Sequence, residues 1–249
     1  MRRSAGPMRR ASRWWASSRA MRHRPARSCR STACSSVPTR SSSVAAMSSL
    51  TTSEGLGFRD LVFSDLVRYR PDEKPTWRGV AVRCLSNPGM IASLVLRGQQ
   101  MAYRRGRIRT AFLLRTVGML LVSADFVPGM DIGPGLLMPH PNGVVIGNGL
   151  VVGANVTFGG GVTAGERQAD RPGGGYPTIC DGAIVLANAV LVGPVTVGAH
   201  AQVGANSVLL SDAPDHAVMF GVPARRISER EGIIPGAQAM PVTDESAGA

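Results

Sequence analysis

The second half of the chain shows a hydrophobic pattern with a period of six residues. An aliphatic side chain recurs at every sixth position, at Ile179, Val185, Leu191, Val197, Val203 and Leu209. Four residues after each lies a small or slender side chain, at Ala183, Ala189, Val195, Ala201, Ser207 and Ala213. An earlier tract repeats the pattern at Ile132, Ile146, Val152 and Phe158, with a two-residue frame shift between Pro139 and Gly143. Repeats of this length are typical of a parallel β-helix, in which each hexapeptide is one short strand and one turn.

Three hexapeptides would close one triangular coil, and roughly eleven of them would give about three to four coils. The aliphatic side chain would point inward, and Gly or Asn would occupy bends that need a positive φ. An antiparallel barrel of short strands is the alternative, and it would show alternation with period two and hairpin turns. Only Asn142-Gly143 and Asn148-Gly149 resemble such turns. The pattern therefore favours the β-helix, a mainly β fold whose coils need caps and usually a partner.

Residues 47–124 carry helical periodicity instead and predict an N-terminal α-helical lobe. The three predicted helices span Ser53–Arg70, Met90–Arg104 and Arg107–Val122. Pro71 and Pro75 end the first, and Asn87-Pro88 suits the start of the next. Six arginines lie between Arg97 and Arg115. We interpret them as a solvated face, with phosphate binding as the alternative.

The positive charge of the chain is concentrated at its beginning. Residues 1–46 carry 11 of the 28 basic side chains, 11 serines and none of the 16 acidic ones. The rest of the chain is close to neutral, which argues against a nucleic-acid-binding surface. Three interpretations of this Arg/Ser-rich leader remain open: a start codon assigned too early, with Met47 as the true start, a disordered tail, or an organellar transit peptide. We treat residues 229–249 as a polar C-terminal tail.

The overall composition is that of an ordinary globular protein, with 44% hydrophobic and 18% charged residues. No window of 18 uncharged apolar residues occurs, so we expect no membrane span. Cys84 and Cys180 are too few for a disulfide framework and lack metal-ligand spacing. We therefore expect no metal and a cytoplasmic location, with organellar import if the leader is a transit peptide.

Several motifs, in order and mutual spacing, resemble the serine O-acetyltransferases, which are hexapeptide-repeat acyltransferases of left-handed β-helix fold. They are Asp125-Phe126-Val127-Pro128, the segment from Leu137 to Gly147, Gly161 to Gly165, Tyr176-Pro177-Thr178-Ile179 and Gly221-Val222-Pro223-Ala224-Arg225. The resemblance covers roughly residues 56–228. It implies an acetyl-CoA-dependent O-acetyltransferase with a left-handed β-helix over residues 125–228, interrupted by a loop at 165–177.

His140 is the candidate general base. It lies where the six-residue frame breaks, between Pro139 and Pro141. In the resembled family the equivalent His takes the proton of the acceptor hydroxyl, and an Asp fifteen residues upstream orients it. Asp125 lies at that distance. Such a pair suits the chemistry, because a hydroxyl becomes a good nucleophile only when an oriented imidazole removes its proton. Asp131, nine residues before His140, is the alternative to Asp125, and we interpret it as a surface side chain. His200 and His216 are interpreted as solvated.

The resemblance also implies where the other groups bind. The backbone at Gly165 and Glu166 would stabilise the oxyanion, and the loop that starts there would reach over a neighbouring subunit's active site. Acetyl-CoA would lie between coils beside Ala187 and Ala205. The side chains of Arg225 and Arg226 would reach its phosphates or, alternatively, form a charged cap on the last coil.

The acceptor pocket departs from the family pattern. The family holds its amino acid with an Asp directly before the catalytic His, an Arg-His pair before the end of the loop, and an acidic residue in the lobe. Here the first two positions read Pro139 and Gly175-Tyr176, and the lobe offers Asp72 or Glu73. The charges of the acceptor pocket are therefore less complementary to those of a zwitterionic amino acid. L-serine remains the first acceptor, which would place the enzyme in cysteine synthesis, and a sugar or polysaccharide-precursor hydroxyl is the alternative.

The resemblance implies a homotrimer through the β-helix, with helical lobes that could pair two trimers. A complex with a cysteine-synthase-type enzyme is not expected, because the family uses a C-terminal Ile and this chain ends in Gly248-Ala249. A non-catalytic scaffold is the rival from another functional class. His140 and Asp125 distinguish the enzyme from the scaffold, since a scaffold needs neither residue.

Overall fold

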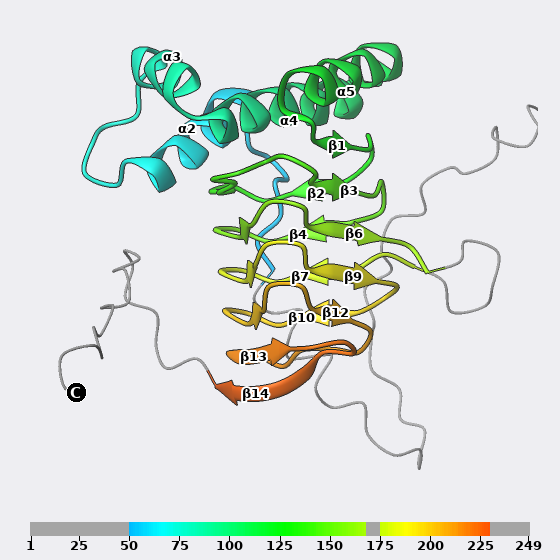
Figure 1. The fold of residues 1–249 in the computed structure, drawn as a ribbon. Coiled ribbons are helices and arrows are strands. Elements are labelled where there is room, and N and C mark those ends of the chain that lie inside the picture. Colours follow the sequence, from blue (N-terminus) through cyan, green and yellow to red (C-terminus); the bar gives the residue numbers. More distant parts are fainter. Residues whose placement is uncertain (1–49, 168–174, 230–249) are drawn as a thin grey trace, which may run out of the picture. The chain divides into compact units, whose positions relative to one another are not determined.

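The computed structural model describes residues 50–167 and 175–229, and the leader, the middle of the 165–177 loop and the C-terminal tail lie outside these ranges. The helices are α2 (Phe58–Tyr69), α3 (Trp77–Ser86), α4 (Pro88–Arg104) and α5 (Ile108–Val122). They precede the strands, as the sequence predicts (Figure 1). None of the helices in the described ranges is long and apolar enough to cross a bilayer.

Helix α3 was not predicted. Its N-terminus is capped by Thr76, whose hydroxyl accepts a hydrogen bond from the Gly79 N–H at 3.1 Å. Its only buried side chain is Val80, and it is short, with ten residues that lie between Pro75 and Pro88. Helix α4 follows after Asn87, whose side chain accepts from the Gly89 N–H, with Pro88 in the first turn. That start agrees with the prediction.

Three sheets of short strands form the rest of the described chain. Sheet 1 contains β1 (Asp125–Phe126), β3 (Val145–Ile146), β6 (Thr163–Gly165), β9 (Val190–Val192) and β12 (Val208–Leu209). Sheet 2 contains β2 (Asp131–Ile132), β4 (Val151–Val152), β7 (Thr178–Ile179) and β10 (Thr196–Val197). Sheet 3 contains β5 (Thr157–Phe158), β8 (Ile184–Val185), β11 (Gln202–Val203), β13 (Ala217–Phe220) and β14 (Arg225–Glu229). The chain visits the three sheets in turn, which confirms the predicted parallel β-helix.

The register explains the six-residue repeat. In sheet 1, Phe126 pairs with Ile146, Ile146 with Ala164, Ala164 with Leu191 and Leu191 with Leu209. All five are at most 2% exposed, and each follows a strand residue that is not buried. One inward column of apolar side chains per sheet therefore makes up the core. Strand β14 ends the ladder by pairing antiparallel with β13.

Three corners join the sheets, and they position the site. The 3–1 corner, between sheets 3 and 1, consists of residues 138–144, 159–162, 186–189 and 204–207. The 1–2 corner contains residues 147–150, the 165–177 loop and residues 193–195. The coils stack closely at the 3–1 corner, because a Cβ on Gly161 (φ +70°) would lie 2.1 Å from Oδ1 of Asn188 in the next coil. The 3–1 and 1–2 corners are the two edges of sheet 1.

A buried ionic network fixes the lobe on the first coil. Arg97 and Asp65 are both 0% exposed, and the Arg97 Nε and Nη2 donate to the two Asp65 oxygens at 2.9 Å each. Arg97 also donates to the carbonyls of Ile132 (2.6 Å) and Gly133 (2.7 Å). The prediction that Arg97 belongs to a solvated face is therefore wrong. Asp131 lies at the surface, with 33% of its side chain exposed, where it pairs with Arg104 at 3.2 Å and accepts a hydrogen bond from the buried Ser53.

Candidate active site

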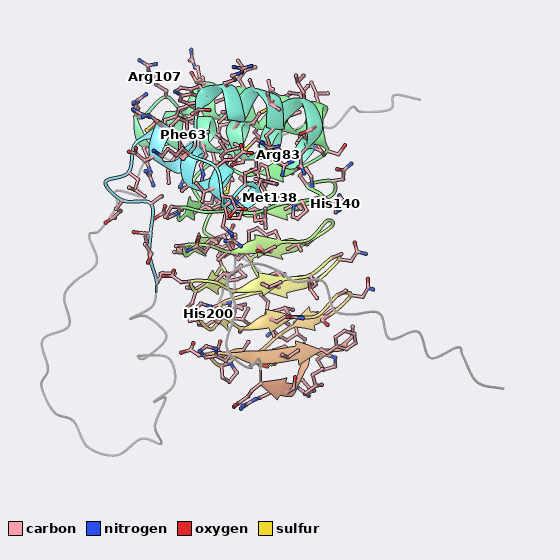
Figure 2. The ribbon with its side chains drawn as sticks, turned by 90° about the vertical axis from the view of Figure 1, so that its left-hand side faces the viewer. Phe63, Arg83, Arg107, Met138, His140 and His200 are labelled. Carbon is pink, nitrogen blue, oxygen red and sulfur yellow. The ribbon has the colours of Figure 1, made fainter. Side chains whose placement is uncertain are left out.

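His140 lies on the 3–1 corner, in the longer turn that the frame shift predicts. Its side chain is exposed, and its carbonyl oxygen would be only 3.0 Å from a Cβ on Gly160 in the next coil. The Tyr69 hydroxyl of α2 holds the preceding segment by donating to the Met138 carbonyl at 3.1 Å and accepting from its N–H at 3.4 Å. Burial raises the pKa of Tyr69 to about 12, so the hydroxyl keeps the proton that it donates. Figure 2 shows Met138 and His140 directly below the lobe.

Asp125 begins β1 at the same edge of sheet 1. It pairs in register with Val145, and its N–H donates to the Val144 carbonyl at 2.8 Å. Its carboxylate accepts from the Arg115 Nε at 2.5 Å and Nη2 at 2.7 Å. This hydrogen bond raises the pKa of Arg115, which therefore stays charged. Each carboxylate oxygen has a second lone pair, so the tether to α5 leaves acceptor capacity for an imidazole.

The predicted acetyl-CoA residues follow His140 down the 3–1 corner. The Asn188 N–H donates to the Gly160 carbonyl at 2.8 Å, and the Asn206 N–H donates to the Ala187 carbonyl at 2.9 Å. Ala187 is exposed and Ala205 is half-buried. The structure thus brings His140, Asp125, Ala187 and Ala205 to a single edge.

Arg225 and Arg226 lie elsewhere, on β14 at the end of the ladder. Both are exposed, and Arg226 pairs with Glu229 on the same strand. This position suits the charged cap that was the alternative interpretation. Their contact with acetyl-CoA stays a prediction.

Gly165, Glu166 and Tyr176 lie at the opposite edge of sheet 1, on the 1–2 corner. The Tyr176 ring covers two glycines of the coil above, since a Cβ on Gly147 or Gly149 would come within 2.5 or 2.2 Å of the ring. Burial, the nearby charge of Glu166 and a hydrogen bond to its side chain raise the pKa of Tyr176. Tyr176, proposed to contact the acceptor, therefore lies close to Glu166, which is at the other end of the loop.

The remaining candidates are spread over the molecule. Pro139 is half-buried beside His140, and Asp72 is exposed in the turn after α2. His200 was expected to be solvated, but its Nδ1 is buried with no hydrogen-bond partner and its ring stacks on His216 at 5.3 Å. Figure 2 places His200 several coils from His140. Within the described ranges, no three His, Cys, Asp or Glu side chains gather in a metal-binding group.

Two contacts of the site were not predicted from sequence. Tyr69 reaches Met138 across 69 positions, and Arg115 reaches Asp125 from a different secondary-structure element. No local motif signals either pairing, because each depends on how the lobe packs against the first coil.

The contact of Tyr176 with the glycines gives a stability prediction. We expect Gly149→Ala to lower the free energy of unfolding by about 1–3 kcal/mol, because the new methyl group overpacks against the ring. Gly165→Ala is the matched control, since a Cβ there meets nothing within 4 Å. Chemical denaturation measures both. Adding Tyr176→Ala should remove the penalty of Gly149→Ala, and a penalty unchanged in that double variant would contradict the packing.

Comparisons with known proteins agree with this geometry. Residues 176–211 match the family model described as bacterial transferase hexapeptide (six repeats). The serine acetyltransferase of Bacillus pumilus is 34% identical over 154 residues, which are 62% of this chain and 70% of that protein. The crystal structure of Neisseria gonorrhoeae serine acetyltransferase matches with a TM-score of 0.64 at 28% identity, covering 72% of this chain and 70% of that one. Serine acetyltransferase from Brucella abortus in complex with coenzyme A matches with a TM-score of 0.60 at 29% identity, covering 68% and 67%.

The fold and the repeat define a hexapeptide-repeat acyltransferase with a left-handed β-helix, as the sequence predicts. Within this class, the chain belongs to the serine acetyltransferase family.

Proposed function

We propose that the chain transfers the acetyl group of acetyl-CoA to the hydroxyl of L-serine, giving O-acetyl-L-serine and CoA. The observation that carries this proposal is the row on the 3–1 corner. An exposed imidazole lies at the break of the repeat, with a carboxylate at the same edge and small residues in the coils that follow. A long thioester substrate can lie along such a row with its reactive carbon at the imidazole.

His140 takes the proton of the acceptor hydroxyl, and the resulting alkoxide attacks the thioester carbonyl. The tetrahedral oxyanion is stabilised by backbone N–H groups at Gly165 and Glu166. When it collapses, the carbon–sulfur bond breaks and the proton held by His140 passes to the departing CoA thiolate. Asp125 orients the imidazole in this scheme.

The proposed site needs more than one copy of the chain. His140 and the Gly165–Glu166 backbone lie at opposite edges of sheet 1, so one chain does not bring both to the same thioester. A threefold arrangement around sheet 1 would bring the 1–2 corner of one copy to the 3–1 corner of the next. This supports the proposal that the active unit is a trimer. Exposed apolar side chains on α5 support pairing of lobes between trimers: Phe112, Leu113, Met119, Leu120 and Leu121.

A specific observation favours a second acceptor class. The positions that should bind the charged groups of an amino acid carry Pro139, Gly175 and Tyr176, and the nearby charge of Glu166 helps to raise the pKa of Tyr176. A sugar hydroxyl needs hydrogen bonds rather than ion pairs. The alternative is therefore an O-acetyltransferase that acts on a sugar or a polysaccharide precursor.

The test is release of free thiol from acetyl-CoA by the full chain, measured with L-serine and then with a panel of sugars and alcohols. We expect saturable turnover with L-serine and identification of O-acetyl-L-serine by mass spectrometry. Turnover with a sugar but none with serine would overturn the serine assignment in favour of the alternative. If no thiol is released with any of these acceptors, both assignments are overturned and the non-catalytic scaffold is supported.

A further inference from the structure

The helical lobe contains a cavity of about 230 Å³ that neither His140 nor Asp125 borders, although Glu73, one of the two acidic candidates of the lobe for the acceptor pocket, does. It lies between α3 and the turn that precedes it, and it is bordered by four charged residues, two hydroxyl residues and two apolar ones. These are Arg70, Glu73, Arg78, Arg83, Thr76, Ser86, Gly79 and Val82.

The charges around this cavity do not balance. Three arginines face one glutamate, and Glu73 is already paired with Arg70. Within the described residues, neither Arg78 nor Arg83 forms an ion pair. The N-terminus of α3 adds positive potential, because Thr76 and Gly79 form the first turn of that helix. The cavity is therefore a concave region of positive potential, which concentrates anions.

Arg83 is held in a fixed orientation at the cavity wall. Its Nη2 donates to the Tyr69 carbonyl at 3.0 Å, and its guanidinium lies over the Tyr69 ring at 5.2 Å. Its Nε is buried and has no hydrogen-bond partner. Arg83 lines the cavity, and a preoriented guanidinium is a good receptor for a planar or tetrahedral oxyanion.

We propose that this cavity is a phosphate-binding site, which takes the phosphate group of a small phosphomonoester through Arg78 and Arg83. Two uncompensated guanidinium groups match the charge of a phosphomonoester dianion better than that of a single carboxylate. The cavity volume exceeds what inorganic phosphate alone needs, so an organic portion of the ligand also fits. This proposal does not rest on the acetyl-transfer activity proposed above.

The test is isothermal titration calorimetry of the full chain with glycerol 3-phosphate, inorganic phosphate and acetate, at matched ionic strength. We expect both phosphates to bind and acetate to bind at least about tenfold more weakly, because it offers one charge instead of two. Matched ionic strength separates a localised site from general screening of a basic lobe. Acetate binding as tightly as the phosphates would overturn the assignment to phosphate, and no heat with any of them would overturn the site.

Variants locate the binding. Arg83→Gln and Arg78→Gln should each raise the dissociation constant for glycerol 3-phosphate by about tenfold or more, since each removes a charge-assisted hydrogen-bond donor. Arg59→Gln is the matched control, because Arg59 is exposed on α2, packs over the Phe63 ring and lies outside the cavity. Arg78 is exposed and forms no ion pair with any residue of the described ranges, so its variant stays informative even if Arg83→Gln unfolds the lobe. Equal losses in all three variants would overturn the site as nonspecific charge attraction.

Discussion

Replacing His140 with Asn should lower kcat by about 10²- to 10⁴-fold, the typical contribution of a general base. The KM for acetyl-CoA should change little, because in the proposed site most of the thioester's length lies beside Ala187 and Ala205 and only its reactive carbon reaches the imidazole. The measurement is steady-state thiol release. His216→Asn is the matched control, since His216 is also exposed, and its φ of +58° is one that Asn155, Asn188 and Asn206 also adopt in this fold. Equal activity in the two variants would contradict the assignment of His140.

Two variants distinguish the proposed role of Asp125 in orienting His140 from its role in anchoring α5 through Arg115. If the carboxylate only anchors α5, Asp125→Asn and Arg115→Met should reduce activity to the same extent. If it also orients His140, Asp125→Asn should cost on the order of 10²-fold in kcat, the effect of a misplaced catalytic group. Arg115→Met leaves the carboxylate in place and should cost much less. Thermal unfolding of both variants shows whether the lobe stays attached.

The β-helix could be predicted from the sequence because its determinants are local. Each coil repeats one inward aliphatic position and one small corner residue, so the period is visible without knowledge of tertiary contacts. The frame shift at Pro139–Gly143 also marked the corner that carries His140. The position of the candidate base was therefore encoded as an interruption of a regular pattern.

The lobe was less predictable because its determinants are side-chain pairings between distant segments. Arg97 carries the same charge as its exposed neighbours along the chain, and only the approach of Asp65 from α2 explains its complete burial. Helix α3 has an N-cap at Thr76, but it is only ten residues long and buries one side chain, Val80. The Arg83 cavity depends on α3, and for that reason it has no signature in the sequence.

The buried Asp65–Arg97 pair should be the most sensitive point for stability. Asp65→Leu should lower the free energy of unfolding by about 3–5 kcal/mol, because it leaves the Arg97 guanidinium buried without its counter-charge. It also removes the acceptor for the Leu136 N–H, which donates to Asp65 at 2.8 Å. Urea denaturation followed by circular dichroism measures the loss. Since the pair joins α2 to α4 and the first coil, the loss should appear in the lobe and in the β-helix together.

We expect a loss of this size in the free energy of unfolding because the Asp65–Arg97 pair is buried, not merely because it is an ion pair. Glu229→Gln breaks the exposed Arg226–Glu229 pair, whose side chains are 46% and 68% exposed, and should cost under about 1 kcal/mol. In the double variant Asp65→Leu/Arg97→Met the guanidinium is gone as well, so the loss should be smaller than the sum of the two single losses. Additive losses would contradict a coupled pair. A loss for Asp65→Leu as small as that for Glu229→Gln would contradict its complete burial.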